Sequence, residues 1–293
     1  MPLPFGIIPP VATPMQATED LDLPRLVWFI DHLCATGIHA AFVLGTNSEC
    51  YALSENEKQA VIATAVQHLG GRLPVYAGTG AETTREALRL TKLAEKERVD
   101  AVTIITPYFI QPNQNELFDY YRRLSEATPL PIVLYSNPAH TSVKIMPETV
   151  ARLAELKNIV GIKDSSGDLQ LTLDYVRLCP PGFAVLQGRD TLIYPSLEFG
   201  CVGAVPASGN IAPKLCVEIY EAWKRGDNEA AKAAQLKLNP ARLSLGLATP
   251  PAGVKAALRL LGVDLGPCRG PIGDPPAVVL EKMKGMLREA GLL

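Results

Sequence analysis

Histidine is scarce in this chain of 293 residues, and its six cysteines include no C-x-x-C pair. The four histidines are not spaced as metal ligands are, so we expect no dedicated metal site. Scattered cysteines in a chain of this length argue against the disulfide framework of a small secreted protein. We expect them to be free thiols, most of them buried.

The sequence also lacks the marks of a membrane or secreted protein. No run of about 18 apolar residues occurs, and the opening MPLPFGIIPP does not have the basic and apolar regions of a signal peptide. A formal net charge of −2 gives no reason to expect nucleic acid or an anionic membrane as a partner. With 47% hydrophobic residues, the composition predicts a globular protein with a sizeable core, and we expect a cytoplasmic location.

Short apolar runs rich in valine, isoleucine and leucine recur along most of the chain. Runs of this kind, without polar alternation, are typical of parallel strands that are covered on both faces. The eight runs begin at Gly6, Ala40, Leu73, Asp100, Leu130, Asn158, Phe183 and Cys201.

The segments between the runs carry helix start and stop signals. Asp22 can cap a helix that has Pro24 in its first turn and Gly37 at its end. Ser54 and Glu57 have the spacing of a capping box at the start of another helix. Eight strands alternating with helices predict an α/β fold of the (β/α)₈ TIM-barrel type.

The alternative fold is an open, doubly wound sheet. That fold would need a glycine-rich phosphate turn after an early strand, and VLGTNSE, which follows the second run, has only one glycine. The strand-like runs end near Pro206. We therefore expect the barrel in residues 1–223 and a C-terminal helical extension, packed on the barrel, in residues 224–293.

A single lysine stands at the end of the sixth run, in VGIKDSS. Strand alternation places Lys163 on the same face as Gly161 and Ile159. If that face is the barrel interior, the amine lies at the carboxyl end of the strand, where barrel enzymes carry out their chemistry. Burial favours the neutral amine of a lysine, which is a nucleophile for ketones. The alternative is a lysine that reaches water or pairs with Asp164.

Two further stretches belong to the same end of the barrel. Tyr135, in LYSNPAHT, ends the fifth run, where its hydroxyl can exchange a proton with a substrate oxygen; alternatively, its ring fills the top of the barrel. In GTNSE, after the second run, backbone N–H groups and the hydroxyls of Thr46 and Ser48 can bind a small anion such as a carboxylate. The alternative there is an ordinary turn between strand and helix.

Taken together, these motifs resemble the dihydrodipicolinate synthase / N-acetylneuraminate lyase superfamily over most of the chain. The G-T-x-x-E motif appears at residues 45–49, T-P-Y at 106–108, the tyrosine and its loop at 135–141, and G-I-K at 161–163. LQGRD, VGAVPASGN and PPAGVKAALRLLG are similar to the family's later segments.

The resemblance implies a homotetramer of barrels that needs no cofactor, because Lys163 itself forms a covalent imine with pyruvate or another 2-keto acid. By the same resemblance Tyr135 would shuttle protons, and Thr46 and Asn47 would hold the keto-acid carboxylate. Gly188, in LQGRD, would leave room beside the substrate. An aldehyde would be the second small-molecule partner.

Several positions depart from the synthase pattern. Asn47 and Ser48 replace a threonine and a glycine and add side chains that can contact substrate. Tyr108 and Phe109 are expected beside the substrate, but Phe109 stands where the synthase donates a second tyrosine across a subunit interface, and a phenyl ring cannot relay a proton. His140 replaces an arginine that binds a second carboxylate; histidine lacks the arginine fork and can be neutral at pH 7.

These departures favour a polar or polyhydroxylated aldehyde over aspartate semialdehyde. The leading hypothesis is a class I aldolase or lyase that makes or breaks a C–C bond of a 2-keto-3-deoxy sugar acid or 4-hydroxy-2-oxoglutarate. The alternatives are 4-hydroxy-tetrahydrodipicolinate (dihydrodipicolinate) synthase, a keto-deoxy sugar acid dehydratase or decarboxylase, and a non-catalytic keto-acid-binding barrel. The presence of both Lys163 and Tyr135 weighs against the last of these.

Overall fold

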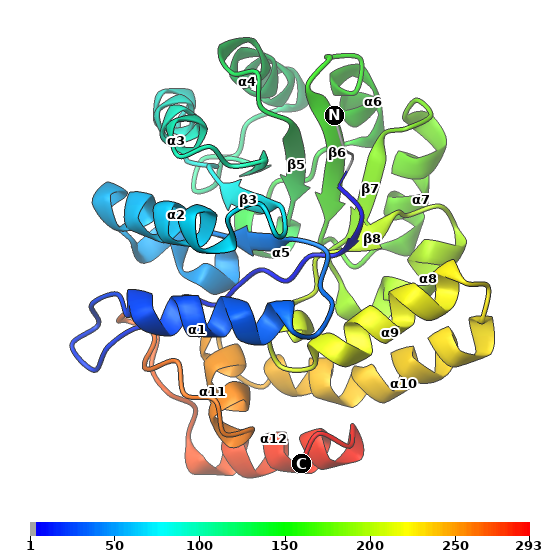
Figure 1. The fold of residues 1–293 in the computed structure, drawn as a ribbon. Helices are drawn as coiled ribbons and strands as arrows, with labels where there is room; N and C mark the ends of the chain where they lie inside the picture. The colour runs from blue at the N-terminus through cyan, green and yellow to red at the C-terminus, as the bar shows by residue number, and fades with distance from the viewer. Residues whose placement is uncertain (1–3) are drawn as a thin grey trace.

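A sheet of eight parallel strands forms the centre of the computed structural model, which describes residues 4–293 (Figure 1). The strands follow one another around the sheet in the order β1-β8-β7-β6-β5-β4-β3-β2. They are β1 (Gly6–Ile7), β2 (Ala41–Val43), β3 (Val75–Gly78), β4 (Ala101–Ile105), β5 (Ile132–Ser136), β6 (Ile159–Asp164), β7 (Ala184–Gln187) and β8 (Gly203–Ala204). Each apolar run of the sequence forms one strand, so the predicted barrel is confirmed.

The sheet closes between β1 and β2 through a short bridge. Pro10 and Phe42 pair in parallel, the Phe42 N–H donates to the Pro9 carbonyl at 3.1 Å, and the Val11 N–H donates to the Phe42 carbonyl at 2.8 Å. Because β1 also pairs with β8, the strands form a closed ring in sequence order. An open, doubly wound sheet is therefore excluded.

Helices follow the strands and cover the outside of the ring (Figure 1). The longer ones are α1 (Leu23–Cys34), α2 (Glu55–Leu69), α3 (Thr84–Lys96), α4 (Gln114–Ala127), α6 (Pro147–Leu153), α7 (Leu169–Leu178), α8 (Ile193–Glu198) and α9 (Pro213–Lys224). The Asp22 carboxylate caps α1 by accepting a hydrogen bond from the Arg25 N–H, and Ser54 and Glu57 form the predicted capping box of α2. One short helix, α5 (Pro138–Thr141), lies in the loop after β5.

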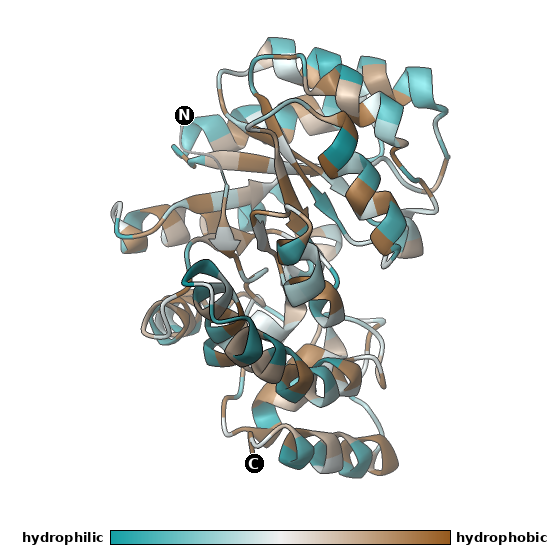
Figure 2. Cartoon of the chain, turned by 90° about the vertical axis from the view of Figure 1, so that its right-hand side faces the viewer, coloured by the Kyte–Doolittle hydropathy of each residue, from teal (hydrophilic) through white to brown (hydrophobic). Residues whose placement is uncertain are grey.

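The core lies between the helices and the strands. Figure 2 shows hydrophobic colour along the central strands and alternating hydrophobic and hydrophilic stretches on the helices. In α1 the buried side chains are Leu26, Phe29, Ile30 and Leu33, which are the apolar positions expected from the sequence. No helix in residues 4–293 has the length and apolar character needed to cross a lipid bilayer. The cytoplasmic location stays a prediction.

Three further helices follow the barrel: α10 (Asn228–Leu245), α11 (Ala252–Leu260) and α12 (Ala277–Glu289). They lie together on one side of the molecule, yellow to red in Figure 1. Helix α10 packs along α9 and also meets the turns at Asp190–Leu192 and Ala207–Asn210, which follow β7 and β8. The extension therefore reaches the carboxyl ends of the strands.

A buried ion pair joins the loop after β2 to this extension. The Lys255 Nζ on α11 lies 2.6 Å from the Glu49 Oε1, and the two side chains are 1% and 0% exposed. The Arg269 N–H donates to the Glu49 Oε2 at 2.8 Å, and the Lys255 Nζ donates to the Pro267 carbonyl at 2.6 Å. Breaking a buried pair leaves an uncompensated charge and costs about 3–5 kcal/mol. The loop that carries Thr46 and Asn47 is thus held from the C-terminal side.

Candidate active site

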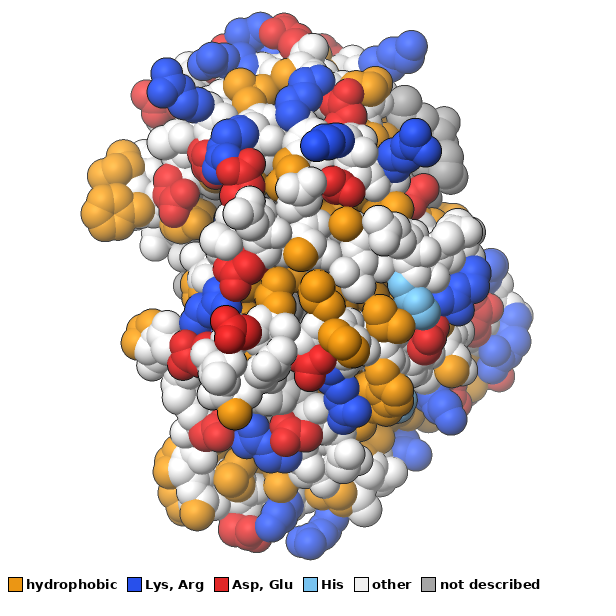
Figure 3. All heavy atoms as spheres, turned by 60° about the vertical axis from the view of Figure 1, so that its left-hand side comes forward, with side chains coloured by type: hydrophobic (Ala, Val, Ile, Leu, Met, Phe, Trp, Pro, Cys, Tyr) orange, Lys and Arg blue, Asp and Glu red, His pale blue; other side chains and the backbone are white. Residues whose placement is uncertain are grey.

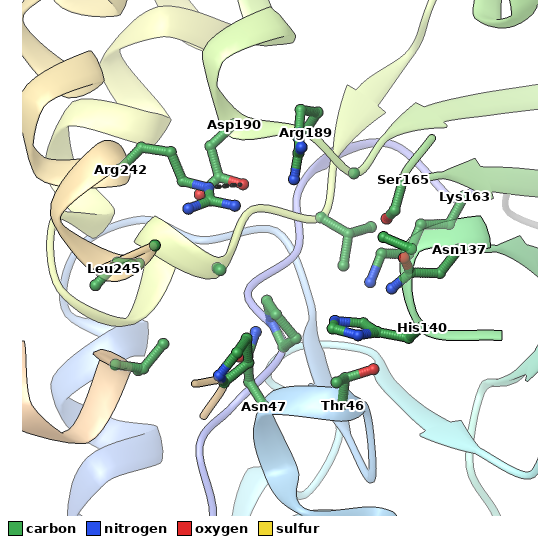
Figure 4. A pocket seen from close by; sticks show the side chains of 18 of the residues that line it. Thr46, Asn47, Asn137, His140, Lys163, Ser165, Arg189, Asp190, Arg242 and Leu245 are labelled. Atoms are coloured by element: carbon green, nitrogen blue, oxygen red, sulfur yellow. Dashed lines mark ion pairs between the residues drawn. The ribbon is translucent and has the colours of Figure 1, made fainter. Parts of the chain in front are cut away.

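A cavity of about 270 Å³ opens at the carboxyl ends of the strands. Its walls come from the loops after β2, β5, β6 and β7 and from helix α10. In Figure 4, Arg242 and Asp190 face Lys163, Asn137 and His140 across this space. This is the end of a (β/α)₈ barrel at which active sites are found.

Lys163 lies at the end of β6 with its amine inside the barrel. The side chain is 4% exposed, and its Nζ lies 3.9 Å from the centroid of the Tyr135 ring and 5.3 Å from that of Phe42. The Asp164 carboxylate turns away and accepts hydrogen bonds from the Thr172 hydroxyl at 2.6 Å and the Ser166 N–H at 2.9 Å. Lys163 forms no ion pair with Asp164, so the alternative of a solvated or Asp164-paired lysine is wrong.

Tyr135 stands directly beside Lys163, because β5 and β6 pair these two residues in register. Its hydroxyl accepts a hydrogen bond from the Asn137 Nδ2 at 2.9 Å and lies 3.5 Å from the Thr46 Oγ1. Burial raises the pKa of Tyr135, but the charge of Lys163 and the hydrogen bonds from Thr46 and Asn137 outweigh it and hold the pKa below its usual range. A phenol of lowered pKa is a better acid for proton transfer near neutral pH.

The loop after β2 divides its side chains between the cavity and the core. Thr46 and Asn47 line the cavity. Ser48 is fully buried and does not line it. The Ser48 hydroxyl donates to the Val11 carbonyl at 2.5 Å and accepts from the Gly45 N–H at 3.1 Å. The tight turn at Thr46–Ser48 points Ser48 inward, so the structure gives it the place of a loop-stabilising residue.

His140, on α5, lies at the edge of the cavity. Burial, followed by the positive charges of Lys163 and Arg189, lowers its pKa. This favours the neutral imidazole, which supplies neither the charge nor the fork of an arginine.

Gly188 also lines the cavity, after β7. A Cβ built on it would collide with the Ser165 hydroxyl and would lie 2.8 Å from the Asp164 carbonyl oxygen. The absence of a side chain at Gly188 therefore makes room first for Ser165, which itself lines the cavity.

Tyr108 and Phe109 lie outside this cavity. Tyr108 lines a neighbouring cavity of about 610 Å³, where burial and a hydrogen bond with Glu82 raise its pKa. Phe109 is 90% exposed and has a left-handed φ of 71°. Phe109 therefore points outward, whereas the cavity that Tyr108 lines shares Thr46 and His140 with the first one.

The sequence reasoning missed five polar residues of the cavity: Asn137, Ser165, Arg189, Asp190 and Arg242. Asn137 lies two positions after Tyr135, so strand alternation alone places both on one face. Arg189 follows Gly188 in LQGRD, a motif that the sequence analysis had already singled out. Arg242 lies within an amphipathic helix of the extension, and nothing in its local pattern separates it from a surface arginine.

Comparisons with known proteins agree with this geometry. A model of the dihydrodipicolinate synthetase family matches residues 3–290. The 4-hydroxy-tetrahydrodipicolinate synthase of Methanopyrus kandleri is 38% identical over 98% of this chain and 97% of that protein. The dihydrodipicolinate synthase structure from Thermotoga maritima has a TM-score of 0.96 at 33% identity, with both chains fully covered. YagE, a prophage protein of Escherichia coli K12 solved in complex with pyruvate, has a TM-score of 0.95 at 31% identity, with 99% of each chain covered.

Proposed function

The chain belongs to the dihydrodipicolinate synthetase family and is a class I aldolase, a lyase that needs no external cofactor, and we propose that Lys163 is its imine-forming residue and pyruvate its keto acid. The observation that carries the proposal is the buried Lys163 amine against the ring of Tyr135, inside the cavity. The non-catalytic alternative is therefore not retained.

In the proposed reaction, the Lys163 amine adds to the ketone carbon and water leaves, which gives an iminium. Loss of a methyl proton gives an enamine, and its carbon attacks the aldehyde carbon while the aldehyde oxygen takes up a proton. Water then hydrolyses the new imine and frees the lysine; cleavage is the same sequence in reverse. We propose that Tyr135 carries these protons; the contacts of its hydroxyl with Thr46 and Asn137 support this role.

Thr46 and Asn47 would hold the pyruvate carboxylate. They line the cavity, the Thr46 Oγ1 lies 3.5 Å from the Tyr135 hydroxyl, and the Glu49–Lys255 pair joins their loop to the C-terminal helices. A held carboxylate orients the ketone towards Lys163 and makes imine formation effectively intramolecular. The pyruvate in the YagE complex supports this choice of keto acid.

The aldehyde is the open part of the assignment. The leading reactions form or cleave a 2-keto-3-deoxy sugar acid or 4-hydroxy-2-oxoglutarate, since the neutral form of His140 is favoured and Phe109 cannot relay a proton. The second candidate is 4-hydroxy-tetrahydrodipicolinate synthase, favoured by the names of the relatives. Dehydration or decarboxylation of a keto-deoxy sugar acid would use the same imine.

The aldehyde preference can be measured directly. We expect aspartate semialdehyde not to exceed glyceraldehyde, glyoxylate and aromatic aldehydes by more than about 10³-fold in kcat/KM, since the cavity lacks the loop arginine of the synthase. Condensation rates with pyruvate and each aldehyde check this. A larger preference, worth more than about 4 kcal/mol of transition-state stabilisation, would replace the leading assignment with the synthase.

We propose further that the chain assembles as a homotetramer through the loop after β4. Phe109 and Ile110 are 90% and 74% exposed there, and a left-handed φ is costly for a bulky residue such as Phe109. Exposed aromatic and aliphatic side chains suit the core of an interface. Figure 3, in which the left-hand side of Figure 1 comes forward, shows hydrophobic side chains gathered between charged ones on this face of the molecule.

At micromolar concentration, light scattering is expected to give a mass of at least a dimer. Phe109→Asp should shift the mass towards the monomer, because it places a charge in the interface core. Phe199→Asp is the matched control, since Phe199 is also an exposed aromatic, 58% accessible, but lies at the end of α8. A wild-type protein that is strictly monomeric would refute the assembly.

A further inference from the structure

Two arginines face the cavity and have no role in the imine chemistry. Arg189 follows β7, and Arg242 projects from α10 on the wall opposite Lys163 (Figure 4). Neither guanidinium makes a hydrogen bond with any residue from 4 to 293. Arg242 is 20% exposed, and its Nε, fully buried, lies 3.6 Å from the Asp190 Oδ1. Arg189 is solvent-exposed. Arg242 is mostly buried, and a guanidinium held at the cavity wall without a close hydrogen bond can take up an anionic ligand.

The surrounding contacts hold Arg242 in place before any substrate arrives. The Asp190 Oδ2 accepts hydrogen bonds from the Ser208 N–H at 2.6 Å and the Ser208 hydroxyl at 2.5 Å, which leaves Oδ1 towards Arg242. Gln235, on the same helix as Arg242, donates to the Asp190 carbonyl at 2.9 Å. The closest contact of this ion pair is at the Nε of Arg242. The Nη groups make no hydrogen bond with residues 4–293, so the fork can still bind a ligand.

The charges around the cavity are unbalanced. Lys163, Arg189 and Arg242 line it as basic residues, and Asp190 is the only acid among its lining residues. An iminium on Lys163 keeps its positive charge, so Asp190 and one pyruvate carboxylate still leave one cation without a counter-charge. After burial, the positive charges of Lys163 and Arg189 also lower the pKa of His140, which lines the same cavity.

We propose that Arg189 and Arg242 bind a carboxylate on the aldehyde-derived part of the substrate. This rests on the proposed function, which places pyruvate on Lys163 and therefore directs the second substrate towards these arginines. The guanidinium fork matches a carboxylate with two parallel hydrogen bonds. Among the leading reactions, this proposal favours 4-hydroxy-2-oxoglutarate, because its aldehyde part, glyoxylate, carries a carboxylate.

The test compares succinic semialdehyde with butanal, two four-carbon aldehydes that differ in the terminal carboxylate. We expect a preference for succinic semialdehyde of about 10²-fold in kcat/KM with pyruvate. Arg189→Gln should lower kcat/KM for succinic semialdehyde about 10–100-fold, the scale of a charge-assisted hydrogen bond. The kcat/KM for butanal should change much less. Arg242→Lys keeps the charge beside Asp190 but loses the guanidinium fork. It should lower kcat/KM for succinic semialdehyde by a similar factor. Arg225→Gln, outside the cavity, is the control.

Three results separate the possible failures. An equal loss of kcat/KM for both aldehydes would show that the arginines only support the fold, and would overturn the proposal. The proposal would also be overturned if kcat/KM rose more from glyceraldehyde to glyceraldehyde 3-phosphate than from butanal to succinic semialdehyde. Borohydride trapping of pyruvate, measured on the same proteins, reads the imine independently. If trapping fails in the wild type, the proposed function falls; if trapping succeeds and the carboxylate preference is absent, only the arginine site falls.

Discussion

Replacing Lys163 with alanine is expected to abolish covalent trapping of pyruvate by borohydride and to lower turnover by about 10⁴–10⁶-fold, the scale for removing a covalent nucleophile. The reason is that, within residues 4–293, Lys163 is the only lysine that lines the cavity, and it lies beside Tyr135. Peptide mapping after borohydride treatment should find the adduct on Lys163 alone.

Two other lysines serve as controls. Lys255 is as buried as Lys163, but Glu49 and the Pro267 carbonyl hold its amine, so it is not free to attack a ketone. Lys144 is exposed, and Lys144→Ala should trap pyruvate as the wild type does. Because Lys163 makes no ion pair within residues 4–293, Lys163→Ala should melt close to the wild type. An adduct on Lys144 or Lys255 would contradict the assignment.

Tyr135→Phe is expected to leave imine trapping measurable and to slow turnover by about 10²–10⁴-fold, as removal of a positioned acid–base group does. The substitution deletes only the hydroxyl that Thr46 and Asn137 contact, and the ring against Lys163 remains. Steady-state turnover and single-turnover trapping, measured together, separate the loss of proton transfer from a loss of imine formation.

Tyr121→Phe is the matched control for this change. Tyr121 is also fully buried, and its hydroxyl donates to the Ile104 carbonyl at 3.0 Å, outside the cavity. Its loss should cost about 1 kcal/mol of stability and leave turnover within a few-fold of wild type. If Tyr135→Phe behaved like Tyr121→Phe, the Tyr135 hydroxyl would have only a packing role.

The barrel could be predicted because its signals are local. A parallel strand covered on both faces is apolar at every position, so each run was visible without knowledge of its neighbours. Capping signals such as Asp22 and the Ser54–Glu57 box are equally local, and the structure confirms both. Closure of the ring by the Pro10–Phe42 bridge depends on packing across the barrel and had no such signal.

The site was predictable only where the side-chain direction follows from the strand. Lys163 and Tyr135 end two adjacent strands, and alternation places both in the barrel. In loops the direction depends on turn geometry, which is why Ser48 points into the core rather than the cavity. Arg242 enters from a helix outside the barrel, and only the three-dimensional packing of α10 on the turns after β7 and β8 brings it to the site.

The contacts of Glu49 also set when the protein can first become active during its synthesis. The ribosome releases this residue 220 positions before Arg269, one of its partners, which at usual elongation rates is a delay of about 10–40 s. Until Lys255 and Arg269 have emerged, the Glu49 carboxylate has no counter-charge, and an unpaired charge resists burial. A nascent chain that ends at residue 223 therefore has every strand of the barrel and still lacks a finished active site.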